Sequence, residues 1–238
     1  MAWDESKHPR KKENGRFDKK DGSSSSAYTD GVNARIAEAK ELGIPVPLNA
    51  DGSVDDLRLQ EDIDKEKQFR ARKVIQKCHE IEKLSRHLDY EVGTIISPDG
   101  LVIASNDGGS NVVYMDKSLL KGNIVTHNHP KGSMFSTDDI KGFIEGELLQ
   151  LRASTPSGKV YVITRVKDWV KPNLLSDYKK AGTRGTEGAR EVQRKFEEYS
   201  EFLSEYDAFC KAVNEYKENW LYENAHKYNI KFEVEWND

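Results

Sequence analysis

Long hydrophobic runs are missing from this sequence of 238 residues. No segment approaches the ~18 to 20 apolar residues that cross a bilayer, and the N-terminus carries no hydrophobic core of a signal peptide. We therefore expect no membrane partner. We also expect a protein that is made in the cytoplasm and stays there, unless a secretion system exports it or it is packaged into a virion.

Cysteine is nearly absent. Cys78 and Cys210 lie far apart and form no CxxC pair. Each falls on the face of an expected helix, which predicts buried, reduced thiols in a cytosolic protein.

An excess of basic charge is missing too, because 37 basic and 41 acidic residues give a net charge of −4. Without a local patch, this balance argues against nucleic acid as a partner. Hydrophobic residues make up only 36% of the chain, and its mean hydropathy is −0.79. Part of the chain is therefore predicted to be exposed, extended or disordered.

The first 55 residues are predicted to form a flexible basic arm and a linker with a short helix. Residues 1–31 are polar and charged, so they bury too little apolar surface to offset the ordering of the chain. A helix is expected over 32–42, because Gly43 and the following "IPVP" cannot continue it.

Residues 56–170 are predicted to form one α+β domain, in which a mixed β-sheet is flanked by helices. Pro98, Asp99 and Gly100 predict a tight hairpin, since proline presets the turn and glycine supplies a positive φ. The remaining expected elements are a helix over 56–88, strands over 111–115, 122–127 and 159–166, and a helix over 136–153.

Residues 171–238 are predicted to be a loop, a long helix striped with aromatic residues over 187–227, and a closing edge strand over 229–236. The loop glycines form no phosphate cradle. A three-and-four spacing sustained over 187–227 favours packing against another long helix. That partner is either the 56–88 helix of the same chain or a second copy, which leaves oligomerisation through 187–227 open.

The stretch "NIVTHNHPKGSMFSTDDI" carries the chemistry. His127 and His129 follow a β-branched run, so both imidazoles project to one side of an extended segment and can reach one ion. Asp138 or Asp139, in the first turn of the next helix, can supply a carboxylate. Three protein ligands and an open fourth position predict a catalytic zinc site.

A metal-dependent hydrolase also needs a carboxylate that takes a proton from water. Glu91 opens an otherwise apolar strand, where burying a carboxylate is costly unless it has a partner such as a metal-bound water. Ser136 is placed to cap the next helix. Asn128 points away from the histidines and is expected either to support the turn or to hold a residue of the site in place.

Glu91, the His-x-His-Pro of residues 127–130 and the Ser-x-x-Asp of residues 136–139 together resemble the JAMM metal motif of the JAB/MPN family. The "HNHP" form looks most like the RadC-type and phage-encoded bacterial branch. The resemblance implies a layered fold like that of cytidine deaminases, with zinc bound by His127, His129 and Asp139. It also implies that Glu91 is the general acid/base and that Ser136 hydrogen-bonds the developing oxyanion.

This sequence departs from the family pattern in one spacing. Six residues, "PKGSMF", separate His129 from Ser136, where the family usually has seven. The choice between Asp138 and Asp139 as third ligand therefore stays open, although Asp139 keeps Ser-x-x-Asp intact. The resemblance covers about residues 88–166.

The family hydrolyses peptide or isopeptide bonds, which predicts a zinc metallopeptidase or isopeptidase. Its substrate would be a protein or peptide, such as a ubiquitin-like conjugate or a phage structural protein. Residues 8–17, "HPRKKENGRF", resemble segments of minor head and portal-associated proteins of tailed phages. This favours a mobile-element gene, a place in a bacterial cytoplasm or virion, and an alternative function as a structural protein without catalysis. A metal-dependent nuclease is a third, weaker hypothesis.

Overall fold

The structure is a computed structural model that describes residues 24–109, 113–167, 170–181 and 187–237. The chain divides into two compact units, Met1–Arg70 and Ala71–Asp238. Helix α2 (Asp56–Ser85) contributes residues to both units. Within the described ranges, no helix has the length and hydropathy needed to cross a membrane.

In the first unit, α1 (Ser24–Leu42) packs on the beginning of α2 through a small apolar cluster of Ala39, Leu59 and Ile63. The Arg35 guanidinium donates two hydrogen bonds of 2.6 Å to the Asp56 carboxylate. The predicted helix over 32–42 is confirmed, but it begins at Ser24, so residues 24–31 do not belong to a flexible arm. Extending a helix that packing has already nucleated costs little. The arm predicted over residues 1–23 lies outside the described residues.

In the second unit, the described residues form one six-stranded mixed sheet with the order β2-β1-β3-β4-β5-β6. Strands β3 and β4 are parallel, and every other neighbouring pair is antiparallel. This confirms the α+β class, the hairpin at Pro98–Gly100 and the edge strand at the end. The strands are β1 (Val92–Ile96), β2 (Val102–Asp107), β3 (Ile124–Asn128), β4 (Gln150–Ser154), β5 (Lys159–Arg165) and β6 (Ile230–Trp236).

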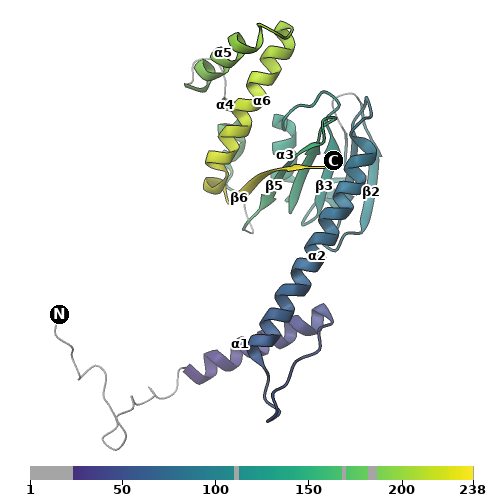
Figure 1. Cartoon of the computed structure of the whole chain (residues 1–238), viewed down its shortest axis with the longest axis vertical. Helices are drawn as coiled ribbons and strands as arrows, with labels where there is room; N and C mark the ends of the chain where they lie inside the picture. The colour runs from purple at the N-terminus through teal and green to yellow at the C-terminus, as the bar shows by residue number, and fades with distance from the viewer. Residues whose placement is uncertain (1–23, 110–112, 168–169, 182–186, 238) are drawn as a thin grey trace, which may run out of the picture. The chain divides into compact units, whose positions relative to one another are not determined.

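Helices cover both faces of this sheet (Figure 1). On one face, Val74 and Cys78 of α2 pack against Ile96 and Ile124. On the other face, α3 (Thr137–Glu145), α4 (Asn173–Lys180) and α6 (Glu205–Asn224) enclose the main core. Because β3 lies between two layers, all five of its residues are buried.

The predicted helix over 136–153 is wrong in its second half. Helix α3 ends at Glu145, and residues 150–154 form β4 instead. The chain reverses through Glu147, whose φ of 48° is left-handed. Leu148 and Leu151 continue the three-and-four spacing of the apolar residues in α3, which suggested a longer helix. A strand that is buried on both faces also carries successive apolar residues, so the spacing did not distinguish the two structures.

Two further local predictions are also wrong. Residues 173–180, expected in a loop, form α4, in which Leu174 and Tyr178 lie one turn apart and are fully buried. The strand expected over 111–115 is not formed by residues 113–115, which have no regular structure, while residues 111 and 112 lie outside the described residues.

The single long helix expected over 187–227 is two helices, α5 (Glu187–Tyr199) and α6, that pack against each other. Ser204 starts α6 by accepting a hydrogen bond from the Asp207 N–H. The helix therefore finds its partner within the same segment and not in α2. Phe202, at the turn, and Tyr206 stay more than half exposed.

A buried ionic network ties α2 to the sheet. Arg152 of β4 is fully buried and donates hydrogen bonds of 2.6 Å to Glu82 of α2 and to Glu235 of β6. Thr126 of β3 donates to the same Glu82 carboxylate at 2.9 Å. Three strands are thus joined to one helix by charge-assisted hydrogen bonds.

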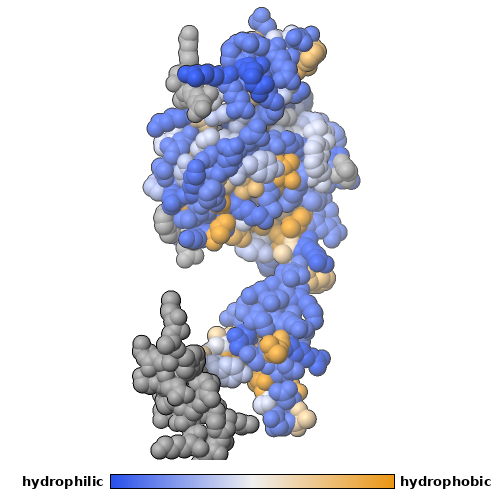
Figure 2. All heavy atoms as spheres, turned by 60° about the vertical axis from the view of Figure 1, so that its left-hand side comes forward, coloured by the Kyte–Doolittle hydropathy of each residue, from blue (hydrophilic) through white to orange (hydrophobic). Residues whose placement is uncertain are grey.

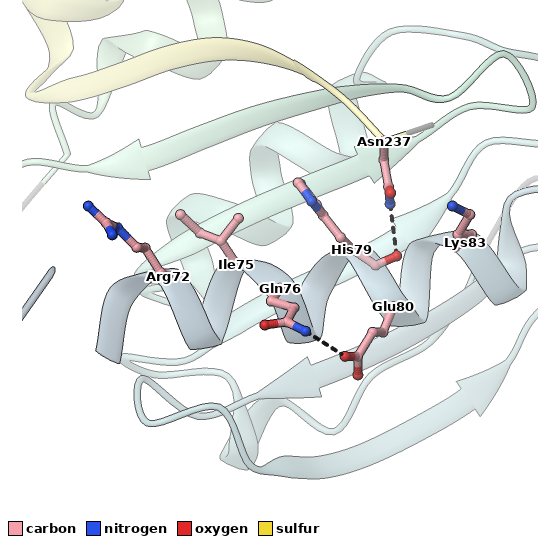
Figure 3. A pocket seen from close by; sticks show the side chains of 7 residues that line it. All are labelled: Arg72, Ile75, Gln76, His79, Glu80, Lys83 and Asn237. Carbon is pink, nitrogen blue, oxygen red and sulfur yellow. Dashed lines mark hydrogen bonds between the residues drawn. The ribbon is translucent and has the colours of Figure 1, made fainter. Parts of the chain in front are cut away.

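The C-terminal strand is also fastened to α2 at the surface. The Asn237 amide donates a hydrogen bond of 2.8 Å to the His79 carbonyl, beside a shallow hollow on the helix (Figure 3). The His79 imidazole lies 2.8 Å from Glu235. The molecular face shown in Figure 2 is mostly hydrophilic, and its apolar patches are small and separate.

Candidate metal centre

Three side chains converge at the end of β3. The Nε2 atoms of His127 and His129 lie 2.8 Å apart. The Asp139 carboxylate lies 3.3 Å from the His127 Nε2 and 3.4 Å from the His129 Nε2. One ligand atom from each residue falls within 4.8 Å of the others, so this group could hold a metal ion.

The backbone and one carbonyl orient the histidines. The His129 N–H donates to the Ser154 carbonyl of β4 at 2.8 Å, which extends the strand pairing by one residue. The His129 Nδ1 lies 2.8 Å from the Ser133 carbonyl. A carbonyl can only accept, so Nδ1 carries a proton, and in the neutral ring Nε2 offers its lone pair to the centre.

Asp139, and not Asp138, contacts both histidines. Ser136 caps α3, with its hydroxyl accepting the Asp139 N–H at 3.1 Å, while the Asp139 carboxylate accepts the Ser136 N–H at 2.6 Å. This capping box turns the aspartate back toward β3. Asp138 is exposed on the wall of the same cavity. The six-residue "PKGSMF" spacer is therefore long enough for Asp139 to reach the histidines.

The electrostatic interactions among the three side chains favour an ionised carboxylate beside a protonated imidazole. Burial raises the pKa of Asp139, but the charge of His127 and hydrogen bonds from both histidines outweigh it, and this pKa lies well below its usual range. Burial lowers the pKa of His129, while the Asp139 carboxylate and the Ser133 carbonyl raise it above its ordinary value. Zinc binds an ionised carboxylate and an unprotonated imidazole nitrogen, so its binding here would release the proton from the His129 Nε2.

The spacing also suits zinc. Ligand atoms at 2.0 to 2.1 Å from a tetrahedral ion lie roughly 3.3 to 3.4 Å apart. The His127 Nε2 lies 3.3 Å from Oδ1 of Asp139 and the His129 Nε2 lies 3.4 Å from Oδ2, so each distance is near this value but involves a different oxygen. For a single oxygen to serve as ligand the carboxylate has to turn, and the two imidazoles have to separate by roughly half an ångström more. Within the described residues, three protein ligands at this point leave a fourth position for water or substrate.

Glu91 lies beside this group. It is 8% exposed, and its electrostatic interactions are with both histidines and with Asp139. Burial raises the pKa of Glu91, the charges of the histidines lower it and Asp139 raises it, with a net upward shift. The structure therefore brings together every residue that the sequence predicted for the site.

Asn128 has the supporting role that was one of its two expected roles, and the structure shows which residue it supports. Its amide donates to the Tyr90 carbonyl at 2.9 Å, and its carbonyl accepts the Val92 N–H at 2.6 Å. It thereby fixes the backbone on both sides of Glu91. In the sequence, the position of Asn128 between two candidate ligands was the only sign of this role. Its partner Val92 lies 36 residues away, so the contact itself could not be predicted.

Replacing Asn128 with alanine is expected to loosen Glu91 without removing any candidate ligand. Two buried hydrogen bonds are lost, so the free energy of unfolding should fall by about 1–3 kcal/mol. Zinc stoichiometry should stay unchanged while any hydrolytic kcat falls, as measured by elemental analysis and by steady-state kinetics. Asn123→Ala, which removes one amide–carbonyl bond to Leu119 far from Glu91, is the matched control. Equal losses of kcat in both variants would contradict a positioning role.

A cavity of about 420 Å³ adjoins the centre. Glu91, His127, Ser136 and Asp139 line it together with apolar residues from the sheet, from α3 and from the segment after β2. Comparison with known proteins gives no match to a family model, a curated protein or a solved structure.

Proposed function

We propose that this protein is a zinc-dependent hydrolase of peptide or isopeptide bonds, of the JAMM type within the JAB/MPN family, encoded by a phage or mobile element. One observation carries the proposal: His127, His129 and Asp139 converge on one point while Glu91 lines the same cavity. Helix capping or packing in the core could explain each of these residues taken alone. Neither explains why the Glu91 carboxylate is buried beside three side chains of the kind that bind metals.

The roles follow from chemistry. A zinc ion in this site would polarise the scissile carbonyl and make a water more acidic. Glu91 takes the proton from the attacking water and passes it to the leaving nitrogen. The Ser136 hydroxyl accepts the Asp139 N–H, so its own proton is free to donate to the carbonyl oxygen as negative charge develops. Asn128 holds the backbone of Glu91.

Zinc binding tests the first half of this proposal. We expect about one equivalent of zinc per chain by elemental analysis, and a stabilisation of about 2.7 kcal/mol when free zinc is a hundredfold above its Kd. His127→Ala should lose both, because a ligand is removed. His226→Ala, an exposed histidine far along the chain, should lose neither. Less than half an equivalent in the wild-type protein would count against the site.

A second function, an interaction protein that uses the same scaffold without catalysis, is favoured by the aromatic residues exposed at the turn between α5 and α6 and at the beginning of α6. Phe202, Tyr206 and Phe209 are 71%, 67% and 54% exposed. If this function holds, the wild-type protein self-associates in light scattering, Phe202→Ser with Tyr206→Ser abolishes that association, and the zinc-loaded protein cleaves no peptide. Peptide cleavage by the wild-type protein would exclude the scaffold-only alternative.

A further inference from the structure

The cavity beside the candidate metal centre changes from polar to apolar along both of its walls. On β3, Val125 precedes His127 by two residues and lies on the same face, about 6 to 7 Å away. On α3, Asp139 is followed four residues on by Phe143, about 6 Å along the helix. All four residues line the cavity. On both walls, therefore, a polar side chain gives way to an apolar one about 6 Å from the metal-type ligands.

The apolar part is well sheltered. Leu120, Leu148 and Leu151 also line the cavity, and each is less than 8% exposed. Met115 covers it from the segment after β2, and packs over Gly93, which pairs with His127 across β1 and β3. A Cβ at Gly93 would lie only 2.9 Å from the Met115 sulfur, so a glycine is needed for this close approach.

The size and place of this space fit a side chain. At about 420 Å³, the whole cavity lies within the range of about 300–1,000 Å³ for ligand sites. Its apolar part begins about 6 Å from the metal ligands, which is within reach of the side chain next to a bound carbonyl, since consecutive Cα atoms are about 3.8 Å apart. A glycine at that position would leave the apolar surface without a partner.

We propose that this apolar part is a specificity subsite that takes a leucine, methionine or phenylalanine side chain directly beside the scissile bond of a peptide substrate. This inference rests on the proposed function and names its substrate class. Filling the subsite is expected to favour a bulky apolar residue over glycine by about 10- to 100-fold in affinity or in kcat/KM.

Gly142 offers a clean way to fill the subsite. It lines the cavity from α3, and a Cβ there would meet nothing within 4 Å. Gly142→Leu therefore adds bulk at the cavity while improving helix propensity, so the variant is expected to fold. Lys141→Leu adds the same side chain to the exposed neighbouring position, which does not line the cavity.

The experiment compares two zinc-chelating probes, N-acetyl-leucine hydroxamate and N-acetyl-glycine hydroxamate, by calorimetric titration of the zinc-loaded full chain. The wild-type protein and Lys141→Leu should bind the leucine probe about 10- to 100-fold more tightly. Gly142→Leu should bring the two affinities to within about threefold of each other, because its side chain takes the place of the ligand's. Equal affinities in the wild-type protein, or an unchanged preference in Gly142→Leu, would overturn the subsite.

A second measurement separates this inference from the proposed function. The zinc-loaded protein is incubated with a peptide library, and new termini are identified by mass spectrometry. Cleavage beside leucine, methionine or phenylalanine supports both proposals. Cleavage without that preference overturns the subsite alone. A leucine preference in binding without any cleavage overturns the hydrolase and leaves an apolar subsite in place, and a chain that binds no zinc overturns both.

Discussion

Replacing Glu91 with glutamine is expected to lower peptide hydrolysis by about 10²- to 10⁴-fold, the usual contribution of a general acid/base. Glutamine keeps the shape of the side chain but cannot take a proton from water. Zinc content should not change, since Glu91 is not among the three residues that could hold a metal. The two quantities are measured together, as kcat/KM on a cleaved peptide and as zinc per chain by elemental analysis.

The two neighbouring aspartates provide the matched controls for this variant. Asp138→Asn changes a carboxylate on the wall of the same cavity, and should retain both zinc and activity to within a few-fold. Asp139→Asn weakens a metal ligand and one half of the capping box, so zinc should be lost along with activity. If Glu91→Gln left hydrolysis intact, the proton would have to be carried by another residue, and the proposed mechanism would be wrong.

Replacing Arg152 with leucine is expected to lower the free energy of unfolding by about 3–5 kcal/mol. The Arg152 side chain is fully buried, and so is that of Glu82, its partner at 2.6 Å. Removing the guanidinium leaves a buried carboxylate unpaired, which costs more than the pair contributed. Urea denaturation of the full chain, followed by circular dichroism, measures the loss.

Two variants make this prediction falsifiable even if Arg152→Leu folds poorly. Arg152→Leu combined with Glu82→Leu removes both charges and should recover most of the lost stability. Arg194→Leu removes an exposed partner of Glu198, 3.8 Å away on α5, and should cost about 0–1 kcal/mol. A double variant that is no more stable than Arg152→Leu would show that the network acts through packing and not through charge.

The same network predicts acid sensitivity. Burial raises the pKa of Glu235, but hydrogen bonds and charge from Arg152, and then those from His79, lower it below its ordinary value. A carboxylate whose pKa is lowered by folding adds stability above its unfolded pKa of about 4.3, and loses it as the pH falls through the folded value. The free energy of unfolding should therefore fall below about pH 4.3. The fall should be smaller in Arg152→Leu.

Local patterns were enough to predict most of the candidate site. His127 and His129 follow a β-branched run, and alternation along a strand forces both to one side, as the 2.8 Å between their Nε2 atoms shows. Ser136 and Asp139 obey the spacing of a capping box, which is a property of the first helical turn alone. The choice of Asp139 over Asp138 needed the structure, because it depends on how α3 faces β3.

The predicted helices over 136–153 and 187–227 were too long because the same apolar spacing fits both a continuous helix and a helix followed by a turn and another element. Leu148 and Leu151 continue the apolar spacing of α3, yet they follow a chain reversal at Glu147 and enter the centre of the sheet. Apolar positions every three or four residues also ran through Leu203, where the chain turns back and α5 packs on α6. Neither turn contains proline. The signals that the sequence did offer were Gly146, which ends α3, and Ser204, which caps α6.

By itself, the sequence determined β1, β2, β3, β5 and β6, the hairpin and the residue types that meet at the centre, since each follows from neighbours a few residues apart. Only the tertiary structure decided that Asn128 fixes the backbone of Glu91, that Arg152 is neutralised between Glu82 and Glu235, and that an apolar cavity adjoins the histidines. These contacts join residues 36 to 83 positions apart. Their energies depend on burial and on distance in space, neither of which is encoded in the spacing of residues along the chain.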